Sequence, residues 1–290
     1  MTFTAAAVQI APFKGDYSGN IGRVANAIRQ VSNSDADLAV FPEAALSGYF
    51  LEGGVSDVAV TTQQLAGDLH DRLDDLSSPI DAIIGFYEKS GGNIYNSAAH
   101  IEFGSAGPKV LHVHHKFFLP TYGVFDEERF VARGRDISTY DTRFGRFATL
   151  ICEDVWHTVT PMIAALKGAR VIAAIAASPA RDFSGKTIGN LETYRKLVTA
   201  FAEEHGVWAI NSMLVGFEGG KGFTGGSIIA DPFGTVIAEG PIGDEHILIA
   251  EIDLDLIDIA RAKSPLIADL ESVLEDVARE IDEVNNSQCP

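Results

Sequence analysis

Three side chains of the sequence could supply a nucleophile, a base and a positive charge, and each follows an apolar stretch. Cys152 directly follows the run "ATLI" and is one of only 2 cysteines among 290 residues. Glu43 follows "LAVFP", and Lys116 follows "VLHVHH". A thiol attacks as thiolate, and a neighbouring base or positive charge produces that form. A partly buried carboxylate has a raised pKa and is a better base.

Each of these residues also has an interpretation without chemistry. Cys152 could be an inert core thiol, because Glu153 and Asp154 beside it are acids that would raise its pKa. Glu43 could be a helix cap or a surface acid. Lys116 could extend to solvent from among its aromatic neighbours. Taken one at a time, the three stretches leave both interpretations open.

Three histidines beside Lys116 raise the question of a metal site. His112 and His114 alternate along a predicted strand and share one face, and His115 follows. The sequence has no cysteine pair or further histidine cluster at ligand spacing to complete a site. We therefore expect histidines whose hydrogen bonds are satisfied in the strand or at its rim, and no bound metal.

Short apolar strands and amphipathic helices must position these side chains. Runs bounded by Gly, Pro, Asn or Asp predict strands, and apolar spacing predicts helices over 20–31 and 190–206, the second with Gly206 as its C-cap. A short helix is expected near 160–170. The predicted strands are 4–10, 38–41, 82–87, 97–102, 110–114, 147–151, 171–176, 208–211, 227–230 and 247–252.

This mixture of elements predicts a layered α/β fold with a mixed sheet. The chain has no linker or fixed repeat to divide it, so we expect a single domain over 1–290. Residues 266–284 are predicted to form a C-terminal amphipathic helix that packs on its own core or on a second subunit. The glycine-rich stretch 216–227 is predicted to be a flexible loop.

The composition limits the partners of the chain. The net charge is −18, from 40 acids and 22 bases, which repels nucleic acid and anionic membranes. The sequence contains neither an apolar run of about 18 residues nor a basic leader before its first strand. Cys289 lies in a polar tail, so a disulfide is not expected. We expect a cytoplasmic protein that binds neither membranes nor nucleic acid.

Together, the motifs carrying Glu43, Lys116 and Cys152 resemble the nitrilase superfamily of carbon–nitrogen hydrolases. The similarity runs through "AAAVQIAP", "ADLAVFPEAALSGY", "HHKFFLPTYGVFDEERF", "LICEDVWH" and "GFTGGSIIADPFGTVIAEG". The resemblance implies a four-layer α-β-β-α sandwich with mixed sheets. It also implies a homodimer or higher homo-oligomer, and no metal or organic cofactor.

The resemblance also implies roles for individual residues. Glu43 would be the base and Cys152 the nucleophile that forms a thioester. Lys116 and the backbone N–H of Glu153 would stabilise the oxyanion. Glu127 would be a second acid that orients the substrate or Lys116. The further residues expected around the substrate are Tyr49, Tyr122, Trp156 and Ser178.

Within the superfamily, "KFFLPTYGVFDE" and "CEDVW" resemble amidases and the glutaminase domain of NAD synthetases. Nitrilases tend to have Trp-Glu after the cysteine, whereas Glu153 and Asp154 stand here. Asn190 occupies the place of an expected basic substrate-binding residue, so glutamine itself stays open. The implied function is hydrolysis of the carbon–nitrogen bond of a small linear amide to a carboxylic acid and ammonia.

Three alternatives remain. The same thioester could be captured by an amine, which would make the protein an acyl transferase. The protein could instead be a nitrilase that acts on a small nitrile. It could also be a binding protein without activity, although the joint presence of Glu43, Lys116 and Cys152 argues against that.

Overall fold

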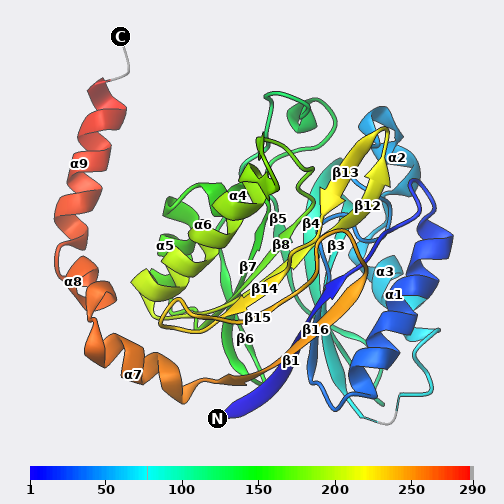
Figure 1. The fold of residues 1–290 in the computed structure, drawn as a ribbon, viewed down its shortest axis with the longest axis horizontal. Coiled ribbons are helices and arrows are strands. Elements are labelled where there is room, and N and C mark those ends of the chain that lie inside the picture. Colours follow the sequence, from blue (N-terminus) through cyan, green and yellow to red (C-terminus); the bar gives the residue numbers. More distant parts are fainter. Residues whose placement is uncertain (77, 288–290) are drawn as a thin grey trace.

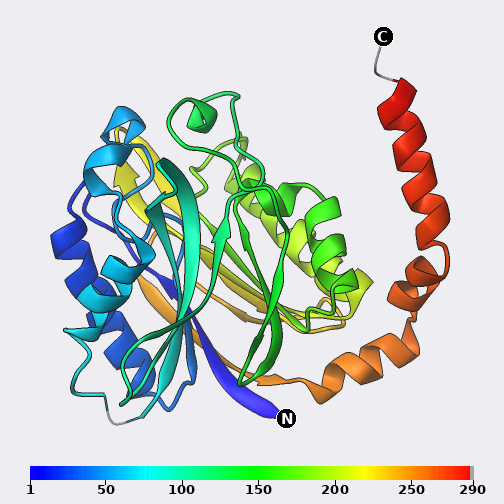
Figure 2. The same ribbon diagram turned by 180° about the vertical axis from the view of Figure 1, so that it is seen from behind.

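Two six-stranded sheets pack face to face, and helices cover their outer faces (Figures 1 and 2). The computed structural model describes residues 1–76 and 78–287. Both sheets contain parallel and antiparallel pairs, for example β1 with β2 and β1 with β16 in the first sheet. The four-layer α-β-β-α sandwich that the resemblance implied is confirmed.

The first sheet has the spatial order β16-β1-β2-β3-β4-β5 and the second has the order β15-β14-β11-β8-β7-β6. The strands of the first sheet are β1 (Thr2–Gln9), β2 (Leu38–Val40), β3 (Ile80–Ser90), β4 (Asn93–Phe103), β5 (Lys109–His115) and β16 (His246–Asp253). The strands of the second sheet are β6 (Thr139–Thr142), β7 (Gly145–Ile151), β8 (Val171–Ala176), β11 (Trp208–Met213), β14 (Ile228–Ala230) and β15 (Val236–Glu239).

Two short pairs of strands and a set of helices complete the described chain. The pairs are β9 (Phe183–Ser184) with β10 (Thr187–Ile188), and β12 (Val215–Glu218) with β13 (Lys221–Thr224). The helices are α1 (Tyr17–Ser32), α2 (Val55–Val58), α3 (Thr62–His70), α4 (Glu153–Trp156), α5 (Val159–Leu166), α6 (Gly189–His205), α7 (Asp255–Lys263), α8 (Leu266–Ser272) and α9 (Leu274–Ser287), with 3-10 turns at Glu52–Gly54 and Glu127–Arg129. Within the described residues, each helix is too short or too polar to span a bilayer.

The alternation of side chains along β1 explains how the layers form. Successive strand residues point to opposite faces of a sheet. Ala5 and Ala7 lie in the core cluster shared with the second sheet, whereas Ala6 and Val8 pack in the cluster formed with α1 and α3. Both faces of the first sheet are therefore covered.

Parallel strands bring the loops that follow them to one edge of the sandwich. β2 runs parallel to its neighbours β1 and β3, and β8 runs parallel to β7 and β11. The loops after β2, β7 and β8 carry Glu43, Cys152 and Ala177. Each strand predicted from the sequence is present, with bounds that differ by a few residues.

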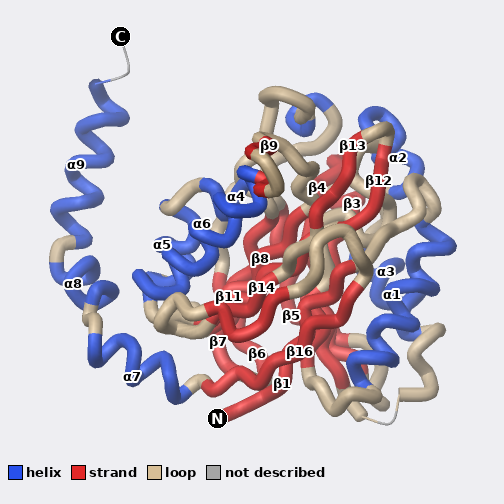
Figure 3. Tube along the Cα trace, in the orientation of Figure 1, coloured by secondary structure: helices blue, strands red, loops and turns tan. Residues whose placement is uncertain are grey.

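The glycine-rich stretch 216–227 is not a flexible loop, as the sequence predicted, but contributes most of the hairpin β12–β13 (Figure 3). Glycine has a low strand propensity, so the strands had no local signal. The hairpin is held by a tertiary contact instead. Glu218 accepts hydrogen bonds from the backbone N–H groups of Tyr49, at 2.9 Å, and Phe50, at 2.9 Å.

The segment 266–284 was predicted to be one amphipathic helix, but it forms α8 and α9 with a break at Val273. The Ser272 hydroxyl donates to the Asp269 carbonyl oxygen at 2.7 Å, which competes with continuation of the helix. Ile267 is buried against the core, while none of the residues of α9 is buried. α9 stands apart from the sandwich in both views (Figures 1 and 2).

Candidate active site

Glu43, Lys116 and Glu127 meet in a buried cluster at one edge of the sandwich. Lys116 Nζ lies 2.8 Å from Glu43 Oε1 and 2.6 Å from Glu127 Oε1. Glu43 and Lys116 are fully buried. Burial alone would lower the pKa of Lys116, but Glu127 and Glu43 hold it well above its ordinary value. The cluster therefore contains a fixed positive charge between two carboxyl groups.

Glu43 is held by contacts from three other elements. Its Oε1 accepts from Lys116 and, at 2.7 Å, from Asn96 Nδ2 of β4. Its Oε2 accepts from the backbone N–H of Ala177 at 2.7 Å. Each oxygen of the carboxylate is thus fixed before any substrate arrives.

A glycine in β3 makes room for the backbone around Glu43. A Cβ atom added at Gly85 would lie 2.3 Å from the Pro42 carbonyl oxygen and 2.6 Å from Glu43 Cα. Any larger residue at this position would displace the loop after β2. Glycine is required here for a close approach of two backbones.

Cys152 sits at the tight turn between β7 and α4. Its φ is 50° and its ψ is −100°, an unusual conformation for a residue with a Cβ atom. Its backbone N–H donates to Ile175 at 2.7 Å, and its Sγ accepts from the Tyr194 hydroxyl at 3.2 Å. Burial, with the charge of Glu43, holds the pKa of the Cys152 thiol well above its ordinary value. The sulfur is therefore protonated at rest.

The acids next to Cys152 point away from its sulfur. Asp154 is fully buried and accepts from the backbone N–H groups of Phe117 at 3.0 Å and Phe118 at 2.9 Å. It also accepts from the backbone N–H of Ile151 at 3.0 Å, and it pairs with His114 Nε2 at 2.9 Å. Asp154 thus ties the loop that carries Lys116 to the turn that carries Cys152.

The side chain of Glu153 contacts residues at the surface of the site. Its carboxylate accepts from the Tyr122 hydroxyl at 2.9 Å and lies 3.7 Å from His157 Nε2. Tyr122 is 48% exposed, so this contact is at the surface of the site. As the first residue of α4, Glu153 has a backbone N–H that the helix leaves free beside Cys152.

Glu127 and Tyr49 form the other side of the cluster. The Tyr49 hydroxyl donates to Glu127 Oε1, the same atom that accepts from Lys116. Burial raises the pKa of Glu127 to about 7, although Lys116 acts in the opposite direction. Glu127 is therefore in contact with Lys116, and its pKa lies close to neutral pH.

Trp156 and Ser178 each contact a side chain of α6. The ring of Trp156 packs edge-on against Tyr194, with centroids 5.4 Å apart. Ser178 is buried, and its hydroxyl accepts from Asn190 Nδ2 at 2.8 Å. Asn190 also accepts from the backbone N–H of Arg181 at 2.9 Å. Asn190 therefore holds the loop after β8.

Three groups near the cluster were missed in the sequence. They are the side chains of Asn96 and Tyr194 and the backbone N–H of Ala177. Tyr194 lies on the apolar face predicted for its helix, so it looked like an ordinary core residue. Asn96 and Ala177 have no local signal, because their partner Glu43 is distant in the sequence.

Two of the three histidines near Lys116 pair with acids, and the third stacks on an aromatic ring. His114 pairs with Asp154, and His115 Nε2 lies 2.7 Å from Glu88 Oε2. The ring of His112 stacks on Tyr140 with centroids 4.4 Å apart. Within residues 1–76 and 78–287, the His, Cys, Asp and Glu side chains form no group of three or more that could hold a metal ion.

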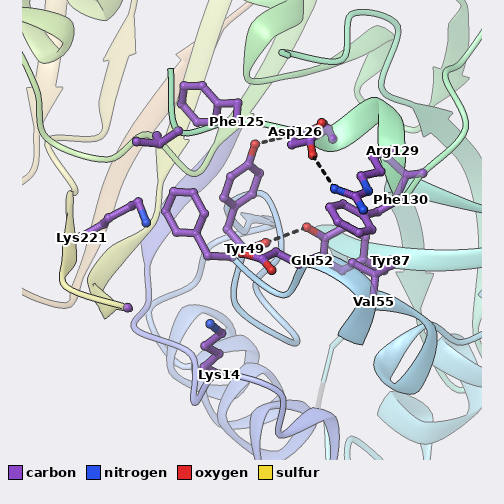
Figure 4. A pocket seen from close by; sticks show the side chains of 15 residues that line it. Lys14, Tyr49, Glu52, Val55, Tyr87, Phe125, Asp126, Arg129, Phe130 and Lys221 are labelled. Atoms are coloured by element: carbon purple, nitrogen blue, oxygen red, sulfur yellow. Dashed lines mark hydrogen bonds and ion pairs between the residues drawn. The ribbon is translucent and has the colours of Figure 1, made fainter. Parts of the chain in front are cut away.

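A cavity of about 440 Å³ lies next to the cluster (Figure 4). Its lining includes Tyr49, Phe125, Lys14 and Lys221, which Figure 4 labels. Glu127 also lines it. Glu127 Oε2 is buried and has no hydrogen-bond partner among the described residues. The cavity therefore leads from the surface to an acid that contacts Lys116.

A buried thiol, a buried carboxylate and a buried ammonium group are residue types that hydrolysis through a thioester can use. The chain belongs to the carbon–nitrogen hydrolase family, whose model matches residues 4–262.

Two curated relatives differ in how much of their length they share with this chain. This chain is 30% identical over 264 residues to an (R)-stereoselective amidase from Pseudomonas sp, and the match covers 88% of this chain and 86% of the amidase. It is 28% identical over 249 residues to a glutamine-dependent NAD(+) synthetase from Thermotoga maritima, covering 85% of this chain and 41% of the synthetase. The chain therefore spans less than half the length of that synthetase.

A solved structure shares the fold. The crystal structure of a carbon–nitrogen hydrolase from Helicobacter pylori G27 matches with a TM-score of 0.80 and 22% sequence identity. The match covers 93% of this chain and 95% of that chain. At this level of identity the likeness supports the architecture alone.

Proposed function

We propose that the protein hydrolyses a small linear amide to a carboxylic acid and ammonia through a thioester on Cys152. The observation that carries this proposal is the fixed Glu43 carboxylate, which bonds to Lys116 and whose charge acts on the Cys152 thiol. A thiol that is protonated at rest needs a base at the moment of attack, and in this proposal Glu43 is that base.

The first half of the reaction forms the thioester. Glu43 takes the proton of Cys152 as the sulfur attacks the amide carbonyl carbon. Lys116 and the backbone N–H of Glu153 stabilise the negative oxygen, each donor contributing about 3–4 kcal/mol in comparable sites. The carbon–nitrogen bond then breaks, Glu43 gives its proton to the leaving nitrogen, and ammonia departs.

The second half of the reaction releases the acid. Water attacks the thioester carbon while Glu43 accepts one of its protons. The carbon–sulfur bond breaks, and the sulfur recovers its proton from Glu43. The products are the carboxylic acid and the free thiol, so the enzyme returns to its starting state.

The test is an ammonia-release screen over short aliphatic amides, glutamine, asparagine, monoamides of dicarboxylic acids and short nitriles. We expect at least one amide to be hydrolysed, and we expect Cys152→Ala to abolish its hydrolysis. Mass spectrometry of the wild-type protein mixed with that amide should show the acyl adduct on Cys152. Ammonia release by Cys152→Ala at the wild-type rate would disprove the mechanism. A product that carries an added amine in place of water would show acyl transfer.

A further inference from the structure

Tyr194 of α6 places a hydroxyl group in the apolar core, directly at the sulfur of Cys152. The side chain is 1% exposed and belongs to the core cluster that also contains Ile151 and Ile175. Its hydroxyl donates a hydrogen bond to Cys152 Sγ at 3.2 Å. A buried hydroxyl needs a hydrogen-bond partner, and here that partner is the sulfur.

The surrounding structure holds the Tyr194 ring in place. Trp156 of α4 packs edge-on against it, with ring centroids 5.4 Å apart. α4 and α6 lie side by side in the helical layer (Figure 1). The first turn of α6 is tied to the loop after β8, because Asn190 Nδ2 donates to the Ser178 hydroxyl at 2.8 Å and to the Pro179 carbonyl oxygen at 2.9 Å. The hydroxyl is therefore directed at the sulfur by the fold.

The groups around the sulfur act on its charge in opposite directions. Burial and the charges of Glu43 and Glu127 raise the pKa of the Cys152 thiol. Lys116 and the Tyr194 hydroxyl lower the same pKa. Lys116 Nζ is bonded to Glu43 and Glu127, at 2.8 Å and 2.6 Å. Among residues 1–76 and 78–287, Tyr194 therefore supplies the side-chain donor that contacts the sulfur itself.

We propose that the Tyr194 hydroxyl stabilises the thiolate of Cys152, first when the thiol loses its proton and again when the thioester carbon–sulfur bond breaks. A hydrogen bond to a charged acceptor is about twice as strong as one to a neutral acceptor. The hydroxyl therefore favours the thiolate over the resting thiol. The part of this inference that concerns the thioester rests on the function proposed above, whereas the effect on the thiolate does not.

Tyr194 donates this hydrogen bond without giving up its proton. Burial, with the charge of the neighbouring sulfur, raises the pKa of Tyr194 well above its ordinary value. In the proposed reaction the proton of Cys152 still passes to Glu43 and returns from it. Tyr194 thus changes the stability of the thiolate and leaves the proton balance of each step unchanged.

Loss of the hydroxyl should change the amount of thiolate and its reactivity in opposite senses. Tyr194→Phe keeps the ring and removes the donor, so we expect the pKa of the Cys152 thiol to rise by about one unit. A thiolate of higher pKa is a better nucleophile, with a Brønsted slope of about 0.4–0.5. Below its midpoint the variant should therefore react about threefold more slowly, and above its midpoint about threefold faster.

The experiment follows the alkylation of Cys152 by iodoacetamide from about pH 6 to about pH 10.5, a range that includes the ordinary pKa of a thiol. Cys289→Ser leaves Cys152 as the one thiol of the chain. Glu43→Gln removes a negative charge that raises the pKa of the thiol, which brings the midpoint toward the measured range. Both changes are present in every protein compared, and mass spectrometry gives the alkylated fraction.

We expect the midpoint of the profile to lie about one unit higher in Tyr194→Phe, so that the two profiles cross. A variant that only loosened the packing would change the rate without moving the midpoint, and that result would overturn the inference. If both profiles still rise at the highest pH, the ratio of the two rates decides, and equal rates overturn the inference.

The matched control is Tyr140→Phe. Tyr140 is a buried tyrosine of the same core cluster, and its hydroxyl lies 2.8 Å from Thr149 Oγ1 and 3.1 Å from His100 Nδ1. This variant loses a buried hydroxyl that does not contact the sulfur, so its midpoint should stay unchanged. The melting temperature of each variant, followed by circular dichroism, shows whether the protein is folded.

A second change at the same position tests the inference if Tyr194→Phe does not fold. Incorporation of 3-fluorotyrosine at position 194 keeps the ring and the hydroxyl but makes the hydroxyl more acidic and a stronger donor. The midpoint of alkylation should then move to lower pH. A midpoint that does not move would overturn the inference.

Catalysis is measured with Glu43 intact, on an amide found in the ammonia-release screen. We expect Tyr194→Phe to lower kcat by about 3- to 10-fold. The value of KM should change less, because Tyr194 does not belong to the described residues that line the cavity beside Glu127. If the midpoint of alkylation shifts but kcat does not change, thiolate stabilisation stands and its part in hydrolysis is wrong.

The remaining outcomes separate this inference from the proposed function. If the midpoint does not shift but the wild type hydrolyses an amide, the role of Tyr194 is wrong while amide hydrolysis stands. If the midpoint shifts but no amide of the screen is hydrolysed, thiolate stabilisation stands and the proposed hydrolysis fails.

Discussion

Lys116 lies between two carboxyl groups that play different parts. Glu43 also bonds to Asn96 and Ala177, so both of its oxygens are fixed. Glu127 shares one oxygen between Lys116 and Tyr49 and leaves the other without a partner among the described residues. At the scale of single residues, Glu43 is therefore suited to proton transfer and Glu127 to adjusting the charge of the cluster.

This difference predicts how activity depends on pH. Burial raises the pKa of Glu127 to about 7, so Glu127 becomes protonated as the pH falls through that value. Lys116 then loses one of its two negative partners, and we expect kcat/KM to fall below pH 7. Glu127→Gln cannot titrate, so its profile should lack this acid limb. Its plateau should be lower by about 10-fold or more, because a hydrogen bond to a charged group is weakened.

The control for this profile is Asp126→Asn, which alters an exposed neighbouring acid and should leave the limb in place. An acid limb near pH 7 that persists in Glu127→Gln would assign the titration to another group.

The residue types that perform the proposed chemistry could be predicted from the sequence, but their supports could not. Glu43, Lys116 and Cys152 each follow an apolar strand, which is a local signal. Asn96 lies within a strand and Tyr194 on an apolar helix face, and their roles come from contacts with residues 53 and 42 positions away. Such contacts depend on which strands and helices lie side by side, which local patterns do not specify.

At the scale of elements, Asp154 connects two loops that must keep their relative position. It accepts hydrogen bonds from backbone groups after β5 and at the end of β7. Those loops carry Lys116 and Cys152. The sequence showed Asp154 only as an unhelpful acid beside the nucleophile, because its partners Phe117 and Phe118 are remote in the chain.

We predict that Asp154→Asn destabilises the protein and lowers kcat. The amide nitrogen of asparagine would face at least one backbone donor, and an unsatisfied buried group costs about 1–3 kcal/mol. Thermal unfolding should show a lower melting temperature, and steady-state kinetics should show a larger effect on kcat than on KM. Asp141→Asn is the matched control, since Asp141 lies in β6 and pairs with Arg146 at the surface. Wild-type stability and kcat in Asp154→Asn would contradict this role.

The hairpin β12–β13 shows why elements can be missed. Its residues favour turns, yet it forms because Glu218 binds the backbone of Tyr49 and Phe50. The predicted strands, by contrast, were apolar runs whose burial in the sandwich agrees with their local preference. Agreement between local pattern and tertiary packing is what made most of the fold predictable.

At the scale of the whole molecule, α9 is an arm outside the sandwich. Leu274, Ile281 and Val284 are exposed along it, and none of its residues is buried. The anchored part of the tail is α8, where Ile267 is buried against the core. The expected homodimer or higher homo-oligomer remains a prediction, and the apolar stripe of α9 is a surface that could contribute to it.

Removal of residues 274–290 should therefore leave the sandwich intact. We expect the melting temperature at low protein concentration to change by no more than about 2 °C, because surface changes contribute little to stability. Sedimentation of the intact and shortened chains should show a smaller assembly for the shortened chain. A large fall in the melting temperature of a monomeric sample would instead show that α9 packs on its own sandwich.

The protonation state of Cys152 has a consequence for the durability of the enzyme. Peroxide oxidises thiolates far faster than thiols, and oxidation past the sulfenic acid is generally irreversible. Burial and the charge of Glu43 keep the pKa of Cys152 well above its ordinary value, so the resting sulfur is a thiol. We therefore expect peroxide to oxidise Cys152 slowly in the resting protein, and faster when the thiolate forms during the proposed reaction.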